Sequence, residues 1–325
     1  MADDPELGSR PGYPPAAAPI ESTDDAARRP LLDGDDIRAL EGLSLDSLAA
    51  LLAGLGGQRE GPGRSAGFEF VDYRPYTPGD DGRRIDWNIY ARLRELQVRT
   101  APQEARVWLS VLLDVSRSMD FGEPNKLYYG RRLAALLGVV ALLRTDAIQV
   151  HTLGDGGASS GGLLDSAGML GVLVDQLVQL PVGRTTALAS SLRAARDTGG
   201  QPELAVLISD ALVVGEDLNL ALRELARGAR SATLLHVVSP EDEDGGPTGA
   251  IQLVDRETNR RIETLITEEV QERFAQQALR FRARVELQCR ANGVHYAAAS
   301  TDTDPLELLL RVARERTLLR TGAAR

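Results

Sequence analysis

The sequence has few of the residues on which several protein classes depend. Of its 325 residues, one is cysteine and three are histidine, and aromatic residues make up 4% of the chain. The single cysteine, Cys289, excludes an intramolecular disulfide, and no Cys/His spacing typical of a zinc site is present in the sequence. We therefore expect a protein of a reducing compartment, and we predict that it is cytoplasmic.

An excess of positive charge and long hydrophobic runs are also missing. The chain has 37 Lys and Arg against 47 Asp and Glu, which gives a formal net charge of −10. This balance argues against a protein that binds nucleic acid through its phosphates. The longest apolar run, 133–143, is far shorter than the ~20 residues that span a bilayer. We expect neither a nucleic-acid partner nor a membrane span.

Composition divides the chain into four parts. Residues 1–33 are rich in proline and alanine, which predicts a disordered tail. Residues 34–60 carry apolar side chains at three- and four-residue steps, which predicts short amphipathic helices. Residues 61–104 concentrate aromatic side chains, and alternating patterns there predict a β-rich lead-in. Residues 105–322 make up the main domain.

The main domain alternates apolar, strand-like runs with helical patterns. The predicted strands are 107–113, 148–153, 204–208, 233–238 and 294–298, and the predicted helices lie near 125–144, 164–180, 187–198, 216–229, 267–291 and 304–319. This alternation is typical of an α/β fold with a doubly wound, mostly parallel sheet of the Rossmann type. An inserted hairpin is predicted over 250–266. Gly154–Gly162 and the acidic run Glu241–Asp244 are both predicted to be loops.

Polar residues follow the first predicted strand of the main domain. Doubly wound sheets bind ligands just beyond the carboxyl ends of their strands. The strand 107–113 leads into Asp114, Ser116 and Ser118, a D-x-S-x-S arrangement whose oxygens suit a hard divalent cation such as Mg²⁺. Asp and Ser are also preferred helix N-cap residues, so a capping cluster is the alternative interpretation.

Two later segments complete a recognisable pattern. Thr185 lies where a predicted helix opens, and Asp210 follows the strand 204–208. Together with D-x-S-x-S, these pieces resemble the metal-ion-dependent adhesion site of von Willebrand factor A domains. The resemblance implies that Mg²⁺, or Mn²⁺ or Ca²⁺ in its place, is surrounded by Asp114, Ser116, Ser118, Thr185 and Asp210. Arg184 and Ala211 stand where that family commonly has glycine, and we expect both departures to affect the site.

A longer stretch in the lead-in carries a second resemblance. Glu69–Trp87, which reads EFVDYRPYTPGDDGRRIDW, resembles the hallmark of a bacterial family called domain of unknown function fifty-eight. Asp255–Thr258 and Ala291–Tyr296 are similar to the same family, so the resemblance covers about residues 61–320. It implies a von Willebrand factor A-like domain that acts as an adaptor or co-chaperone. Its partners would be a MoxR-type AAA+ ATPase and an unidentified protein client.

The aromatic lead-in also has a purely structural interpretation. Its interleaved arginines and aspartates predict ion pairs that fasten a small platform to the main domain, with Trp87 and Tyr90 packed beneath it. A partner-binding role for this platform is the alternative, because interfaces favour Tyr, Trp and Arg.

Metal-dependent binding of a partner protein, rather than catalysis, is the function that we expect. The sequence contains no G-x-x-x-x-G-K-[ST] loop, so energy from ATP would come from the partner. Two alternatives stay open. A Mg²⁺-dependent phosphohydrolase would use Asp114 as its nucleophile, but Ser116 stands where such an enzyme needs a carboxylic acid. A structural scaffold would leave the site empty and use its oxygens to satisfy backbone donors.

Overall fold

The described part of the chain is mainly the predicted main domain. The computed structural model describes residues 30–41, 72–77, 81–82, 85–100, 106–154, 157–183, 187–198, 200–213, 216–245, 248–254 and 261–311. Most of the predicted tail over 1–33 and of the predicted helical region over 34–60 lies outside these residues, as does Thr185.

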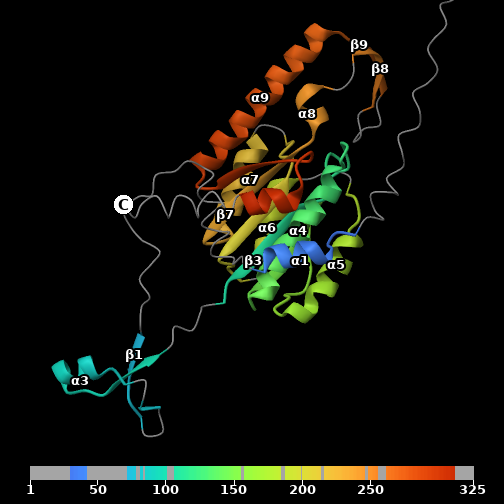
Figure 1. Cartoon of the computed structure of the whole chain (residues 1–325). Helices are drawn as coiled ribbons and strands as arrows, with labels where there is room; N and C mark the ends of the chain where they lie inside the picture. The colour runs from blue at the N-terminus through green and yellow to red at the C-terminus, as the bar shows by residue number, and fades with distance from the viewer. Residues whose placement is uncertain are drawn as a thin grey trace, which may run out of the picture. The chain divides into compact units, whose positions relative to one another are not determined.

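A six-stranded sheet forms the centre of the main domain (Figure 1). Its strands are β3 (Trp108–Asp114), β4 (Ala147–Gly154), β5 (Gly157–Ser160), β6 (Leu204–Ser209), β7 (Ser231–Val238) and β10 (His295–Ser300). They lie in the order β10-β7-β6-β3-β4-β5. Every neighbouring pair is parallel except β4 with β5. The predicted α/β fold with a mostly parallel sheet is confirmed.

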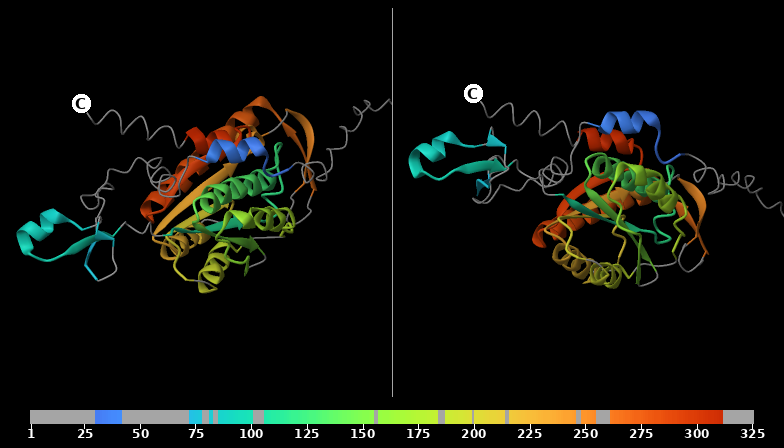
Figure 2. Two further views of the ribbon diagram at one scale, coloured as in Figure 1. Left: turned by 60° about the horizontal axis from the view of Figure 1, so that its bottom comes forward. Right: turned by 90° about the horizontal axis from the view of Figure 1, so that it is seen from below.

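Helices cover both faces of the sheet, which explains why its strands are apolar throughout (Figure 2). One face is covered by α1 (Gly34–Leu40), α4 (Lys126–Leu143), the short η3 (Ala167–Met169), α5 (Leu170–Val178) and the helical residues 305–311. The other face is covered by α6 (Leu188–Asp197), α7 (Glu216–Arg227) and α9 (Glu268–Ala291). The hydrophobic core therefore has two halves, one on each side of the sheet.

Three details of the predicted organisation are wrong. Residues 157–160 of the predicted glycine loop form β5, which adds an antiparallel edge to β4. The acidic run belongs to α8 (Pro240–Asp244), at whose start the Asp242 carboxylate accepts hydrogen bonds from both the N–H and the hydroxyl of Ser239, each over 3.1 Å. The predicted tail extends too far, because Leu31 is buried in the core and the Asp33 side chain accepts hydrogen bonds from the first turn of α1.

The inserted hairpin is present as predicted. It consists of β8 (Gly249–Val254) and β9 (Arg261–Ile266), which pair antiparallel with each other. Ile262 and Leu265 of β9 are exposed. The hairpin leads directly into α9, whose Thr267 cap accepts a hydrogen bond from the backbone N–H of Val270.

The described residues of the lead-in contain two short strands and one helix. β1 (Asp72–Pro75) pairs antiparallel with β2 (Gln97–Thr100), and α3 (Trp87–Leu93) lies between them in sequence. The prediction of a β-rich segment missed this helix. Trp87 is 62% exposed and makes an edge-to-face contact with Tyr90, so the prediction that Trp87 packs beneath the strands is wrong.

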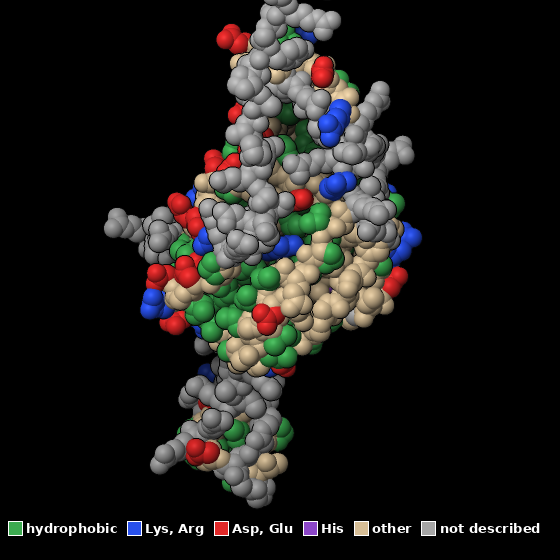
Figure 3. Space-filling view, turned by 90° about the vertical axis from the view of Figure 1, so that its right-hand side faces the viewer, with side chains coloured by type: hydrophobic (Ala, Val, Ile, Leu, Met, Phe, Trp, Pro, Cys, Tyr) green, Lys and Arg blue, Asp and Glu red, His purple; other side chains and the backbone are tan. Residues whose placement is uncertain are grey.

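The surface mixes polar and hydrophobic areas. On the face shown in Figure 3, hydrophobic side chains gather in one region of the body, while acidic and basic side chains are scattered around it. Within the part of the chain that the structure describes, no helix combines the length and the apolar character that a bilayer crossing requires.

Candidate metal-binding site

The register of the sheet brings two aspartates to the same edge. β3 and β6 are neighbours, with Leu113 opposite Ile208, so the residues that follow these two also lie side by side. The Ser209 hydroxyl donates a hydrogen bond to Oδ2 of Asp114 over 2.7 Å. Asp210 comes directly after Ser209. The structure thus places Asp114 and Asp210 together at the carboxyl ends of adjacent parallel strands.

The two serines of the D-x-S-x-S sequence lie at the same place. The backbone N–H of Ser116 donates to Oδ1 of Asp114 over 2.9 Å. The hydroxyl oxygens of Ser116 and Ser118 are 3.0 Å apart. The bond from Ser116 to Asp114 is of the kind that the capping alternative predicts, whereas the convergence of both hydroxyls is what a cation site needs.

Thr185 and Arg184 lie outside the described residues, but the segment before them is placed. The Gly183 N–H donates to the carbonyl oxygen of Val115, which follows Asp114, over 2.6 Å. A Cβ atom added at Gly183 would lie 3.2 Å from that oxygen, which is tighter than ordinary contact. The chain therefore approaches β3 closely, two residues before Thr185, at a position where a side chain is poorly tolerated.

The electrostatics of the site favour an added cation. Burial raises the pKa of Asp114, and the negative charge of Asp210 raises it further, against the opposing hydrogen bonds from Ser116 and Ser209. A divalent cation would stabilise both ionised carboxylates. Two carboxylates and two hydroxyls are suitable donors for Mg²⁺. Among the described residues no three His, Cys, Asp or Glu side chains form a metal-binding group, so hydroxyls and water would complete the coordination.

Lys126, the first residue of α4, was not predicted as part of the site. Its ammonium nitrogen lies 2.9 Å from Oδ2 of Asp210 and 2.9 Å from Oδ2 of Asp242, and its side chain is 1% exposed. Burial alone would lower the pKa of Lys126, but the two carboxylates raise it overall, so the ammonium stays charged. The one signal in the sequence is its place at the start of the helix predicted near 125–144.

The carboxylates of Asp210 and Asp242 compensate for the unfavourable position of the Lys126 ammonium in the first turn of α4. The N-terminus of a helix carries a partial positive charge, which disfavours a lysine in the first turn. Asn125 caps α4 by accepting a hydrogen bond from the backbone N–H of Tyr128 over 3.0 Å. The preceding loop passes close to α8, because Gly122 has φ +86° and a Cβ atom there would lie 2.5 Å from Cβ of Ser239. These contacts bring Lys126 to Asp242.

The turn after Asp210 has the conformation that glycine favours. Ala211 has φ +53°, in the left-handed region, and its side chain is buried. Its N–H donates to the Ser209 hydroxyl over 3.0 Å, and the Leu212 N–H donates to Oδ1 of Asp210 over 3.2 Å. Ala211 thus departs from the glycine of von Willebrand factor A domains at a position where the departure costs backbone strain.

A buried histidine fixes the backbone of Asp210. The Asp210 carbonyl can only accept a hydrogen bond, so Nε2 of His236 donates to it over 2.9 Å. Nδ1 of His236 then accepts from the Tyr296 hydroxyl over 2.9 Å. Burial lowers the pKa of His236 to about 4, so the ring is neutral at physiological pH.

Comparison with known proteins identifies the family. A family model described as "Protein of unknown function DUF58" matches residues 72–284. The chain belongs to this family. Two uncharacterized proteins, from Mycobacterium tuberculosis (strain ATCC 25618 / H37Rv) and Mycobacterium bovis, are each 30% identical to this DUF58 protein over 265 residues. In both cases the match covers 79% of this chain and 80% of the relative.

Solved structures with lower identity also match this DUF58 chain. The conserved hypothetical protein BatB from Bacteroides thetaiotaomicron is 18% identical, with a TM-score of 0.39 and coverage of 66% of this chain and 99% of BatB. The SpRpn10 VWA domain is 12% identical, with a TM-score of 0.34 and coverage of 63% and 94%. The predicted DUF58 membership is confirmed, and the family description assigns no activity.

Proposed function

We propose that this DUF58 protein is a protein-interaction module that binds a carboxylate of its partner through a divalent cation. The observation that carries the proposal is the convergence of Asp114, Ser116, Ser118 and Asp210 at the ends of β3 and β6. The raised pKa of Asp114 supports it, because the ionised carboxyl is unfavourable there without an added positive charge. Thr185 is the fifth proposed ligand.

Charge balance supports a divalent ion. The cluster contains three carboxylates, from Asp114, Asp210 and Asp242, and one ammonium, from Lys126. When all are ionised their formal charge is −2, which one Mg²⁺ ion balances. Mg²⁺ binds six oxygens and commonly keeps several waters, so a ligand position stays open to a partner's Asp or Glu. The cation would then join this chain to a carboxylate of a second protein.

A calorimetric titration of Mg²⁺ and of Mn²⁺ tests the cation site. We expect heat of binding with the wild-type chain and none with Asp114→Ala. Asp175→Ala is the matched control, because Asp175 is an exposed aspartate on α5, outside the site. Equal binding by wild type and Asp114→Ala would contradict the proposal and favour the scaffold alternative, in which the Asp114 carboxylate serves to accept hydrogen bonds such as those from the Ser116 N–H and the Ser209 hydroxyl.

The proposed ATPase partner follows from the resemblance to DUF58 adaptors that act beside MoxR-type AAA+ ATPases. The sequence has no phosphate-binding loop of its own. Size-exclusion chromatography of the chain mixed with a MoxR-type ATPase, in Mg²⁺ and in EDTA, tests the partnership. Co-elution in Mg²⁺ that is lost with Asp114→Ala is the expected result, and separate elution in both buffers would contradict it.

The phosphohydrolase alternative has a direct test. Such an enzyme needs a proton donor two residues after its nucleophile, and this position holds Ser116, whose hydroxyl lies 3.0 Å from that of Ser118. We expect no release of phosphate from p-nitrophenyl phosphate in Mg²⁺. Turnover that Asp114→Ala abolishes would replace the binding proposal with an enzymatic one.

A further inference from the structure

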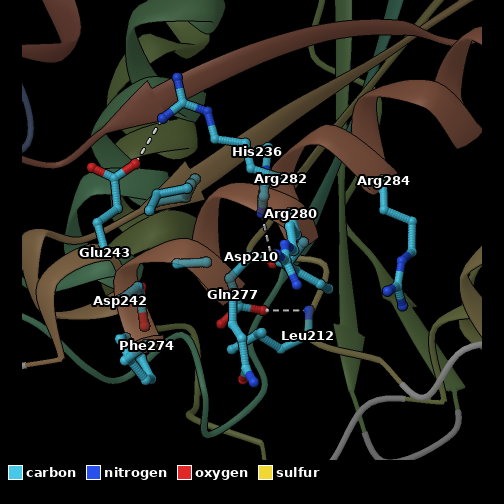
Figure 4. A pocket seen from close by; sticks show the side chains of 14 residues that line it. Asp210, Leu212, His236, Asp242, Glu243, Phe274, Gln277, Arg280, Arg282 and Arg284 are labelled. Carbon is cyan, nitrogen blue, oxygen red and sulfur yellow. Dashed lines mark hydrogen bonds and ion pairs between the residues drawn. The ribbon is translucent and has the colours of Figure 1, made fainter. Parts of the chain in front are cut away.

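A pocket lies beside the candidate metal site, between α9 and the ends of β6 and β7 (Figure 4). Its volume is about 650 Å³, within the range of pockets that enclose ligands. Apolar walls come from both sides of the space: Leu212, Val238, Phe274, Ala278 and Phe281. Asp210 also lines the pocket, so the pocket and the candidate metal site share a residue.

The pocket exists because the apolar face of α9 extends, toward the N-terminus of the helix, beyond the part that packs on the sheet. Val285 and Cys289, near the C-terminal end of the helix, are fully buried in the core. The same face continues toward the N-terminus through Phe281, Ala278 and Phe274 at three- and four-residue steps, where coverage decreases until Phe274 is 42% exposed. The apolar face formed by Phe274, Ala278 and Phe281 therefore faces the pocket.

Some of the cationic side chains around the pocket have anionic partners among the described residues and others do not. Arg282 pairs with Glu243 over 2.7 Å, and Lys126 pairs with Asp210 and Asp242. The two remaining arginines, Arg280 and Arg284, lie one helical turn apart on α9, are exposed, and form no ion pair with any described residue. Two cations are thus available at the rim of an apolar pocket.

We propose that this pocket binds an apolar side chain, of the size of Phe or Leu, from an acidic segment of a partner protein. An anionic group of that segment is held by Arg280 and Arg284. The inference rests on the proposed function, because the shared Asp210 lets one partner segment reach the cation with one carboxylate and the pocket with its neighbouring side chain. The positive charges of Arg280 and Arg284, and the position of the pocket next to the proposed cation, favour an acidic partner segment over a neutral or basic one.

Binding of fluorescein-labelled peptides to the full-length chain, followed by fluorescence anisotropy in Mg²⁺, tests the inference. The probes are Gly/Ser peptides that carry one Phe and an Asp-Glu pair at increasing distance from it. Matched probes replace Phe with Ala, or Asp-Glu with Asn-Gln. We expect at least one Phe/Asp-Glu peptide to bind, and both replacements to weaken it by about tenfold or more.

Variants of α9 locate the binding site. Ala278→Trp fills the pocket, and Ala283→Trp places the same side chain at an exposed position of α9 that does not line it. Arg280→Gln with Arg284→Gln removes the two rim cations, and Arg273→Gln with Arg290→Gln removes the same charge elsewhere on α9. We expect the first member of each pair to weaken binding by about tenfold and the second to change it by less than about twofold.

Each outcome separates the inference from the proposed function. The pocket inference is overturned if no peptide binds, or if Ala278→Trp and the Arg280/Arg284 variant both bind as the wild type does. Binding that resists EDTA and Asp114→Ala, but is lost in the pocket variants, supports the pocket and contradicts the cation proposal. Binding that is lost with Asp114→Ala, but unchanged in the pocket variants, contradicts the pocket alone.

Discussion

Asp114 and Asp210 end neighbouring strands of the same sheet, yet their surroundings differ. Asp210 receives the ammonium of Lys126 on one oxygen and the Leu212 N–H on the other. Asp114 accepts the Ser116 N–H on Oδ1 and the Ser209 hydroxyl on Oδ2. The pKa of Asp114 is raised, first by burial and then by Asp210.

The difference in partners indicates that the two aspartates have different roles in the site. Lys126 binds Asp210 to Asp242 and so links the end of β6 to α8, which makes Asp210 a structural residue as well as a proposed ligand. Burial and the charge of Asp210 disfavour the ionised form of Asp114, so an added cation would stabilise it. Substitutions at these positions and at their neighbours test this difference.

The largest expected effect comes from Lys126→Met. Removing the ammonium leaves Asp210 and Asp242 close together, so we expect a loss of about 3–5 kcal/mol in the free energy of unfolding. Chemical denaturation in EDTA measures it. The control Arg273→Met removes a cation from an exposed pair with Glu269 and should cost less than about 1 kcal/mol.

Addition of Mg²⁺ to the Lys126→Met variant sharpens this prediction. The cluster then has one more uncompensated negative charge, so Mg²⁺ should restore part of the lost stability. If the variant is destabilised and Mg²⁺ does not raise its free energy of unfolding, Asp210 and Asp242 pair with Lys126 and do not contribute to cation binding.

Asp114→Asn is expected to have a smaller effect of the opposite sign. In EDTA near pH 7, the variant should unfold a few degrees above the wild type, because it removes a charge that burial disfavours. The Asn oxygen can still accept from the Ser116 N–H, and its NH2 group can donate to the Ser209 hydroxyl in place of the bond that Asp114 accepts. Mg²⁺ should raise the Tm of the wild type and leave that of the variant unchanged. A lower Tm for Asp114→Asn in EDTA would contradict this account.

The raised pKa of Asp114 also predicts a pH dependence. The folded chain holds this proton more tightly than the unfolded chain does. In EDTA, its contribution is therefore most favourable below the unfolded pKa of about 3.9 and declines as the pH rises through the folded-state pKa. The difference in stability between Asp114→Asn and wild type should grow with pH over this window. A constant difference would exclude Asp114 as the titrating group.

Ser209→Ala removes the hydroxyl that links Asp114 to the turn after Asp210. This hydroxyl donates to Asp114 and accepts from the Ala211 N–H, so we expect a loss of about 1–2 kcal/mol by thermal unfolding. Ser191→Ala is the control, because Ser191 is equally buried but its hydroxyl has no hydrogen-bond partner within the described part of the chain. Equal effects at both positions would contradict the bridging role.

The smallest effect is expected from Ala211→Gly. Relief of the left-handed backbone is offset by the lost burial of a methyl group and by the greater freedom of glycine in the unfolded chain, so the net change should stay within about 1 kcal/mol. Ala211→Val should cost more than about 2 kcal/mol, because a β-branched side chain fits this conformation poorly. Similar costs for both would exclude backbone strain as the cause.

Local patterns predicted most of the fold. The apolar runs of β3, β6 and β7 and the capping residues of α9 lie within short windows of sequence. The proximity of Asp114 to Asp210 followed from a general property of parallel sheets. Even the left-handed turn at Ala211 could be anticipated from the glycine that the resembling family has there.

Contacts between distant segments could not be predicted in this way. Lys126 and Asp210 are 84 positions apart, and nothing in the local sequence pairs them. The pocket under α9 depends on where the sheet ends relative to a helix that follows an inserted hairpin. β5 was missed because its small residues, Gly157–Ser160, have weak strand preference and are ordered by the open edge of β4.

The buried cysteine of α9 gives the protein a built-in reporter. Cys289 is the only cysteine in the sequence, is fully buried, and has a pKa that burial raises to about 12. The thiolate is the nucleophile that reacts with thiol reagents, so labelling of the native protein requires α9 to separate from the sheet and expose Cys289. The rate of labelling by such a reagent therefore measures how often this side of the core opens, with no engineered probe.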